Sequence, residues 1–368
     1  MRFLNIVAIV VACFFASSVY AQEVHEEYQG TWRAKVIEVL SSTSEQVPGT
    51  DATHMLQTIK ARIVEGPEKD KEVIIKNDYL ALKKGDAFYF NHMIDINGVE
   101  YYGIINIDRR LSLLVLVFIF IGAVILFGGW QGVRSLVALV GSFMAIFYVL
   151  LPGLLNGWNP LFASFLVATG ILFIAIFFTH GFNRESAVAY AGTMIAVLIT
   201  GLFSLFAVSM TRLSGFAGDE AMYLNIGTRG SLDFTGLLLG AIIIGILGVL
   251  DDIAVTQAAV VSELYDSNPE LTKIEVYTRA LRVGREHVGA LVNTLVLAYT
   301  GASLPLLLYF RLSDIHFDSV VNMEIFATEI VRAIVGSIGL ILTVPIVTAL
   351  AVVYLKGYTS HHHHHHHH

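Results

Sequence analysis

Long apolar runs between residues 111 and 355 constrain this chain more than any other feature of its sequence. A bilayer core about 30 Å thick is crossed by a helix of about 20 predominantly apolar residues, which is the length of these runs. We therefore predict an α-helical integral membrane protein with about seven transmembrane helices in residues 111–355. The predicted helices are Leu111–Trp130, Ser135–Leu151, Leu161–Phe178, Ser186–Met210, Phe234–Val261, Val288–Phe310 and Ile325–Leu355.

The beginning of the chain has the three parts of a secretory signal. Arg2 is the basic start, Leu4–Phe15 is the apolar core, and Val19-Tyr20-Ala21 places small residues before a cleavage point. We predict that residues 1–21 are a signal peptide and that the domain after it is exported. An uncleaved anchor helix is the alternative, but the apolar core is too short to span a bilayer comfortably.

Cysteine content excludes several kinds of site. The sole cysteine, Cys13, lies in the predicted signal peptide, so the mature protein would have no disulfide, thiolate metal site or cysteine nucleophile. The C-terminal tail, residues 356–368, ends in the expression tag His361–His368 and is set aside. We expect no cofactor, and the sequence leaves the presence of a metal open.

Residues 22–110 have the pattern of a small exported domain rich in β-strands. Five short strand-like runs are separated by turn residues such as Asn97-Gly98, and five strands in about 80 residues fit an all-β barrel of the OB or SH3-like type. The domain is acidic and has no basic patch with aromatic residues, which argues against nucleic acid and favours a rigid cap or assembly surface. The predicted strands are Thr31–Leu40, Leu56–Val64, Glu72–Lys76, Ala87–His92 and Glu100–Ile107.

The positions of the basic residues predict the orientation of the chain in the membrane. Seven spans and an exported N-terminal domain place the C-terminus in the cytoplasm, and the loops on that side should then be rich in Lys and Arg. The longest of these loops contains Ser267-Asn268-Pro269-Glu270, which predicts the start of a helix. The predicted cytoplasmic loops hold Arg134, Arg184, Lys273, Arg279, Arg282, Arg285 and Lys356, against Arg212, Arg229 and Arg311 in the later outer loops.

Two acidic residues, Asp251 and Asp252, lie within the fifth predicted helix. A charge at bilayer depth is costly, so such a residue is a functional candidate by default. Asp251 lies about 26 Å along the helix from Phe234, close to the inner membrane boundary. The alternative to a functional site is therefore that both carboxylates simply reach the water at that boundary. We favour a buried polar site that includes Thr256, on the face of Asp252, and Gln257, because the sequence on both sides of the aspartates is apolar.

The sixth predicted helix carries a matching polar stripe. Its residues recur at spacings of four and seven, which keeps them on one helix face, and they are Arg282, Glu286, Asn293 and Thr300. Glu286 and Asn293 are expected at the depth of the two aspartates, where oxygen ligands suit a hard cation or a proton relay. The same groups could instead only join two helices through hydrogen bonds. Supporting positions are Arg285, His287 and Pro305.

Helix-breaking residues point to the same region. Gly301–Pro305 interrupts the sixth predicted helix and Pro345 lies in the seventh, and proline both removes a backbone donor and kinks a helix. The carbonyls released in this way can line a cavity. In the last helix Gly339 belongs to a face of small residues suited to close packing, and Arg332 is expected to pair with Glu329.

Several of these motifs resemble the YibE/F-like membrane protein family. The resemblance covers about residues 110–355 and implies a bacterial cytoplasmic-membrane protein of several spans, described at most as a transporter and with no substrate to carry over. It includes the Asp251-Asp252 and Arg285–His287 stretches. The segments that carry it are Thr179–Arg184, Gly248–Gln257, Glu263-Leu264, Asn268-Pro269, Val283–Gly289, Asn293–Leu295 and Gly301–Leu306.

These features predict a transporter or ion-coupled exporter of a small solute or ion across the bacterial cytoplasmic membrane. The alternative is a non-transporting scaffold or accessory subunit whose exported barrel docks a partner. An intramembrane hydrolase fits poorly because Gly-x-Ser-x-Gly and metal-binding histidines are lacking, so we do not expect an enzyme. The expected partners are the lipid bilayer and a small solute or cation, without nucleic acid, and a homo-oligomer is left open.

Overall fold

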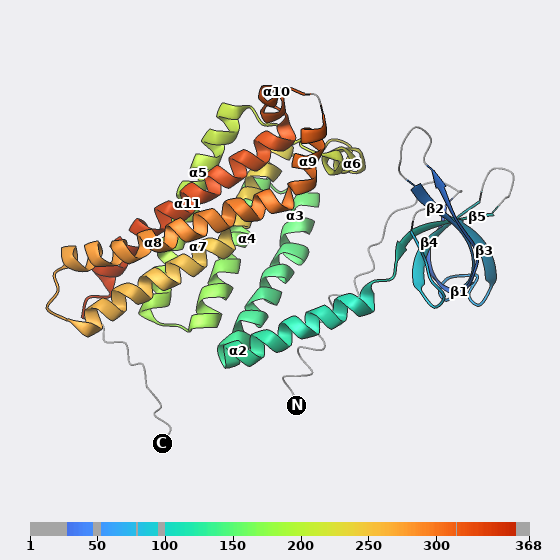
Figure 1. Ribbon diagram of the computed structural model, residues 1–368. Coiled ribbons are helices and arrows are strands. Elements are labelled where there is room, and N and C mark those ends of the chain that lie inside the picture. The colour runs from blue at the N-terminus through green and yellow to red at the C-terminus, as the bar shows by residue number, and fades with distance from the viewer. Residues whose placement is uncertain (1–27, 47–52, 79, 95–99, 314, 358–368) are drawn as a thin grey trace, which may run out of the picture. The chain divides into compact units, whose positions relative to one another are not determined.

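The computed structural model describes residues 28–46, 53–78, 80–94, 100–313 and 315–357. The predicted signal peptide, the turn Asn97-Gly98 and the expression tag lie outside these residues. The chain forms two compact units that divide between Phe120 and Ile121, one built mainly of strands and one of helices (Figure 1).

All five predicted strands are confirmed in the first unit. They form one antiparallel sheet in the order β3-β2-β1-β4-β5. The longest, β1, continues past the predicted end and has two register irregularities against β2, which are the kind of bulge that bends a strand. The strands are β1 (Tyr28–Gln46), β2 (Thr53–Ile63), β3 (Glu72–Asn77), β4 (Ala87–Ile94) and β5 (Glu100–Ile107).

The sheet curls around its own hydrophobic core and forms a half-barrel. Alternate residues of β3 are buried, and the core is centred on the fully buried rings of Phe88 and Phe90 with Ile59 and Ile75. Within the described strands β3 and β5 are the two edges, and no ladder joins them. The closed barrel of the OB or SH3-like type is thus not seen, and an open seam lies between β3 and β5.

The described part of the chain has five helices that are long and apolar enough to cross a membrane, or six if α8 and α9 form one broken span. The prediction of seven differs because its first two spans lie in one helical segment, Arg110–Leu155. This segment comprises α2 (Arg110–Ala145), the π-helix η1 (Ile146–Leu150) and α3 (Leu151–Leu155). It bends inside α2 at Gly129, whose φ of 53° and ψ of −137° are not helical.

Four of the other helices begin at polar caps that the sequence supplies. Asn159, Asn183 and Asp233 each accept a hydrogen bond from a backbone amide in the first turn of the helix that follows, and Thr272 forms a capping box with Glu275. The long elements are α4 (Pro160–Phe173) with the π-helix η2 (Ile174–Phe178), α5 (Arg184–Thr211), α7 (Phe234–Ser267), α8 (Lys273–Ala302), α9 (Leu304–Leu312) and α11 (Glu324–Tyr354). Two short helices, α6 (Asp219–Gly227) and α10 (Phe317–Val321), complete the unit.

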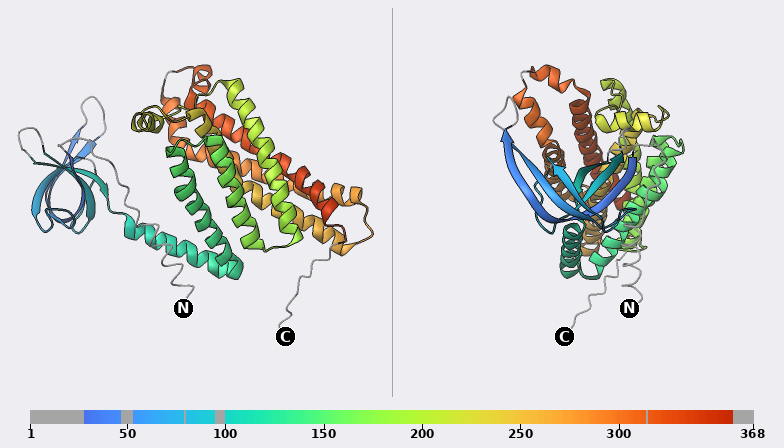
Figure 2. Two further views of the ribbon diagram at one scale, coloured as in Figure 1. Left: turned by 180° about the vertical axis from the view of Figure 1, so that it is seen from behind. Right: turned by 90° about the vertical axis from the view of Figure 1, so that its right-hand side faces the viewer.

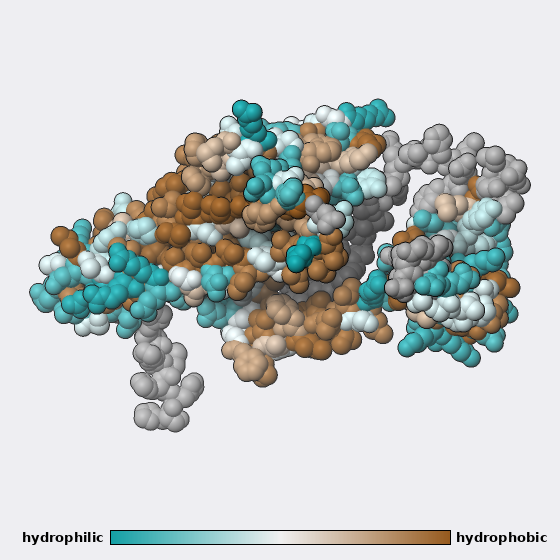
Figure 3. Space-filling view, turned by 45° about the horizontal axis from the view of Figure 1, so that its top comes forward, coloured by the Kyte–Doolittle hydropathy of each residue, from teal (hydrophilic) through white to brown (hydrophobic). Residues whose placement is uncertain are grey.

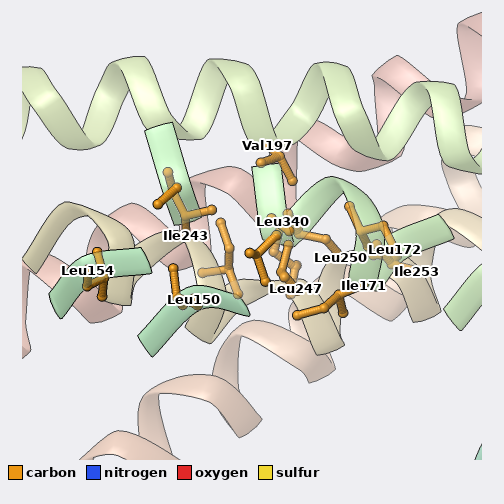
Figure 4. Close-up of a cluster of buried hydrophobic side chains, with 14 of the residues drawn as sticks. Leu150, Leu154, Ile171, Leu172, Val197, Ile243, Leu247, Leu250, Ile253 and Leu340 are labelled. Carbon is orange, nitrogen blue, oxygen red and sulfur yellow. The ribbon is translucent and has the colours of Figure 1, made fainter. Parts of the chain in front are cut away.

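The long helices run side by side in a bundle with α7 and α11 near its centre (Figure 2). Leucine and isoleucine side chains from α3, α4, α7 and α11, with Val197 of α5, converge in the largest core cluster (Figure 4). The small-residue face of α11 allows close packing as predicted, because a Cβ on Gly339 would clash with the Thr200 side chain of α5. The predicted Arg332–Glu329 ion pair is also confirmed, at 3.0 Å.

The surface of the helical unit agrees with a protein that crosses a membrane. On the face shown in Figure 3 it is hydrophobic along the middle of the long helices and hydrophilic at the end formed by the α7–α8 turn. Large apolar side chains of the bundle, such as Phe162, Leu202 and Phe206, are exposed. A multi-pass membrane protein is the architecture that leaves such side chains facing lipid.

Candidate functional site: an acidic cavity between α2, η2 and α7

Asp251 and Asp252 line a cavity of about 490 Å³ between three helical segments. The second arm of α2 supplies Ser135 and Ser142, the end of η2 is followed by His180, and α7 supplies the two aspartates. Asp251 is half-buried and Asp252 is exposed. The α7 residues that line the cavity recur at spacings of three and four from Ile244 to Val255, so the two adjacent aspartates belong to one broad face of the helix.

The polar groups of this cavity are largely uncommitted. The Asp251 carboxylate accepts a hydrogen bond of 2.9 Å from the backbone amide of Asp252, and no ion pair holds either aspartate among the described residues. The Ser142 hydroxyl donates to the Ala138 carbonyl at 2.9 Å. The carboxylates therefore keep lone pairs that a cation or a proton could take.

The cavity opens at one end of the bundle rather than at its centre. Thr179 and His180 line it, and they directly follow Phe178, the last residue of the candidate span Pro160–Phe178. The aspartates therefore lie level with a helix end, as their distance from Phe234 predicted. The two π-helical segments border the same cavity, through Ile146 of η1 and Ile176 of η2. Such segments often mark functional sites in helices.

The polar stripe of α8 does not meet the aspartates. Glu286 and Asn293 do not line the cavity, and both side chains are exposed. The reason is the face that α8 presents to the bundle, which carries the buried Ala280, Gly284 and Leu295. Glu286 lies two residues after Gly284, about 200° around the helix, so it points away. The other predicted polar residues of α8 are exposed as well, namely Arg282, Arg285, His287 and Thr300.

Gln257 has a different environment from the one predicted. It is buried, and its amide nitrogen donates to the Ala280 carbonyl of α8 at 2.9 Å and to the Thr348 hydroxyl of α11 at 2.8 Å. These bonds use both amide hydrogens and join three helices. Thr256, beside it, is half-buried and does not line the aspartate cavity.

The break between α8 and α9 borders a second cavity, of about 430 Å³. The two helices meet at 60°, with Pro305 in the first turn of α9. Thr300 and Ser303 line this cavity together with Glu329 of α11. The helix break was thus predicted correctly, but it adjoins a cavity separate from that of the aspartates.

Sequence reasoning missed the residues that complete the aspartate cavity. Ser135 and Ser142 were not singled out, and Thr179 and His180 appeared only in the segment Thr179–Arg184 of the family resemblance. The available signal was Thr179-His180, a polar pair that ends an apolar run and begins the first segment of the family resemblance. Carboxylate oxygens beside hydroxyls and one imidazole form a ligand set that suits a small cation or a proton relay.

A comparison of the chain with curated proteins and with solved structures gave no match. The model of one protein family, described as YibE/F-like protein, matches residues 116–357. The match runs from the first arm of α2 through α11 and includes every residue of the aspartate cavity. By this match over more than half of its length, the chain belongs to the YibE/F-like protein family.

Proposed function

We propose that the helical unit is a transporter of a small cation or cationic solute, and that Asp251 and Asp252 form its binding site. The observation that carries this proposal is the pair of carboxylates that no ion pair holds among the described residues, in a 490 Å³ cavity of an apolar bundle. Unpaired acidic groups between apolar helices are costly, and function is the usual reason for keeping them. The protein is then not an enzyme and needs no cofactor.

The walls of the cavity contain the irregular elements that a moving pathway needs. The arm of α2 that lines it follows the bend at Gly129, and it passes into η1 at its far end. The opposite wall contains η2. Since π-turns and bends interrupt the regular hydrogen-bond ladder, these segments can rearrange at lower cost than α5 and α7, which are α-helical throughout.

Flux measurements test the proposal. The chain would be reconstituted in liposomes and proton, Na⁺, K⁺ and Ca²⁺ fluxes followed with ion-sensitive dyes trapped inside. Asp251→Asn and Asp252→Asn should reduce the flux of the transported ion at least about tenfold, because each removes a charged ligand. Glu263→Gln is the matched control, since Glu263 is an exposed carboxylate on the same helix. Wild-type flux in both asparagine variants would contradict the proposal.

A non-transporting scaffold or accessory subunit is the second candidate. The buried Gln257 network favours it, because it shows that one predicted polar position joins helices. Under this alternative the aspartates also serve the packing, so their replacement should lower the melting temperature as Gln257→Ala does. Under the transport proposal Asp251→Asn keeps the wild-type melting temperature and Gln257→Ala does not.

We further propose that the protein lies in the bacterial cytoplasmic membrane with the half-barrel outside and the C-terminus inside. The bend at Gly129 supports seven crossings, because a straight segment of 46 residues would be about 69 Å long, more than twice the bilayer core. The half-barrel is then an exported OB or SH3-like module that acts as a rigid cap. Its strand order and short length support this class.

A further inference from the structure

Three possible metal ligands come together at the open seam of the half-barrel. One ligand atom each of Glu68, His92 and Glu100 lies within 4.8 Å of the others. Glu68 comes from the loop before β3, His92 from β4 and Glu100 from the start of β5. The cluster thus joins the two edges of the sheet that no backbone ladder connects.

The histidine of this cluster is buried and has an unsatisfied ring nitrogen. His92 is 7% exposed, and its Nε2 has no hydrogen-bond partner among the described residues. Its ring stacks on that of Tyr102, with centroids 4.9 Å apart and planes 8° from parallel, which fixes the orientation of the imidazole. An orphaned polar atom in a buried position costs free energy, and ligand binding is a common reason for such an atom.

The two carboxylates are held in place by Tyr102. Its hydroxyl lies 2.9 Å from Glu68 Oε2 and 2.6 Å from Glu100 Oε2. A ligating carboxylate in a metal site is commonly oriented by such an outer hydrogen bond. Tyr102 therefore contacts all three candidate ligands: its one hydroxyl proton is shared between the two carboxylates, and its ring stacks on that of His92.

A cation already occupies the space between the carboxylates. Lys71 Nζ lies 2.6 Å from Glu68 Oε1 and 3.0 Å from Glu100 Oε2. Hydrogen bonds to these carboxylates raise the pKa of Lys71 well above its usual range. One ammonium against two carboxylates leaves a net charge of about −1, which a divalent ion in place of the ammonium would neutralise. The Lys71 side chain is 44% exposed and can turn into solvent on its flexible stem.

We propose that Glu68, His92 and Glu100 form a binding site for a divalent transition metal ion such as Zn²⁺, which replaces the ammonium of Lys71. One imidazole nitrogen and two carboxylate oxygens, with water in the fourth position, are a ligand set that zinc takes in proteins. Zinc bonds of about 2.0–2.2 Å require the ligand atoms to approach about 3.4 Å from one another, so the seam tightens on binding. Mg²⁺ and Ca²⁺ prefer all-oxygen sites, so they fit this set less well.

Zinc titration by isothermal calorimetry tests the site. The chain would end at Ser360, because the histidine tag binds zinc, and it would be purified in detergent and stripped with EDTA. We expect one zinc ion to bind per chain, and Lys71→Met to bind at least about tenfold more tightly because the competing ammonium is gone. In the Lys71→Met background, His92→Gln should weaken binding at least about tenfold.

A matched control and a second ligand variant keep the test decisive. Glu72→Gln removes an exposed carboxylate of the same sheet and should leave zinc binding unchanged. If His92→Gln lowers the melting temperature, Glu100→Gln decides instead, because the Glu100 side chain is exposed and should tolerate the change. A folded Lys71→Met chain without saturable one-to-one binding, or equal affinity after removal of either ligand, would overturn the proposal.

Discussion

Two polar side chains less than two turns apart on α7 have opposite surroundings. Gln257 is buried and uses both amide hydrogens in bonds to α8 and α11, whereas Asp251 faces a cavity and accepts one bond from the next backbone amide. A side chain whose donors are all used stabilises packing, and a carboxylate with free lone pairs can bind a cation. Both were predicted as ligands because a sequence shows polarity at a given depth but not the partners of a side chain.

Asp108, directly after β5, forms ion pairs with two arginines at the end of the half-barrel. Its side chain is 6% exposed and lies 2.7 Å from the guanidinium of Arg33 and 3.0 Å from that of Arg110. Hydrogen bonding to Arg110, with the nearby charge of Arg33, lowers the pKa of Asp108 to about 2. This carboxylate therefore stays charged over most of the acidic range in the folded chain.

The lowered pKa of Asp108 predicts acid sensitivity of the half-barrel. A carboxyl with a lower pKa in the folded state stabilises the fold above its unfolded pKa of about 3.9, and this contribution is lost as the pH falls toward 2. The contribution at neutral pH is about 2 kcal/mol. Thermal unfolding followed by circular dichroism between pH 2 and pH 7 should show it. The Asp108→Asn variant should have a lower melting temperature than the wild type at pH 7, and its melting temperature should fall less on acidification. If the melting temperatures of variant and wild type fall in parallel with pH, Asp108 is not the source of the acid sensitivity.

At the scale of elements, the bend of α2 depends on one residue. Gly129 has a positive φ of 53° with a ψ of −137°, a region that residues with a Cβ rarely adopt. The bend makes two arms of one helical segment. The apolar run Leu111–Trp130 ends at this bend, so the sequence predicted its place without predicting that the helix continues beyond it.

Replacing Gly129 should therefore strain the chain. Gly129→Ala is expected to lower the free energy of unfolding by about 1–3 kcal/mol, because the alanine Cβ disfavours this backbone conformation. Thermal unfolding in detergent measures the change. Gly122→Ala is the control, since Gly122 lies in the same helix without a positive φ and with no atom within 4 Å of an added Cβ. Alanine should be neutral or stabilising at position 122. Equal losses of unfolding free energy in both variants would exclude backbone strain at Gly129 as the cause.

Sequence periodicity predicted elements better than their contacts. The strands were found because turn residues separate runs that alternate in burial, as in β3. The start of α8 was placed wrongly at Ser267-Asn268-Pro269-Glu270, where α7 in fact ends, although Thr272-x-x-Glu275 carried the capping-box signal. Similarly, the α8 stripe was found on one face, but which face packs against α7 depends on Ala280 and Gly284 fitting closely, which periodicity does not show.

At the scale of the whole molecule, the family match and the two compact units describe different parts of the chain. The match covers residues 116–357 and leaves the five strands outside. The aspartate cavity therefore belongs to the part that defines the family, and the half-barrel with its proposed metal site is an additional module. Each unit has a core of its own, which is why both could be predicted separately from composition.

Cysteine labelling tests the proposed orientation and the number of crossings together. In a Cys13→Ala background, Ser41→Cys reports on the half-barrel and Glu270→Cys on the α7–α8 turn; both positions are exposed. A maleimide that cannot cross membranes should label Ser41→Cys in cells with a permeabilised outer membrane, and Glu270→Cys only after lysis. Labels on opposite sides require an odd number of crossings between them, so α2 must then cross twice. Labelling of both from outside would contradict the orientation.

The two π-helical segments also determine the direction in which the side chains that follow them point around the helix axis. A π-turn inserts one residue into a helix, and one residue corresponds to a rotation of about 100° for every side chain that follows. Thr179 and His180 follow η2, so their direction depends on that inserted residue. Without it the same two side chains would turn away from Asp251 and Asp252. The chemistry of this cavity is thus decided as much by a count of residues along the chain as by their identity.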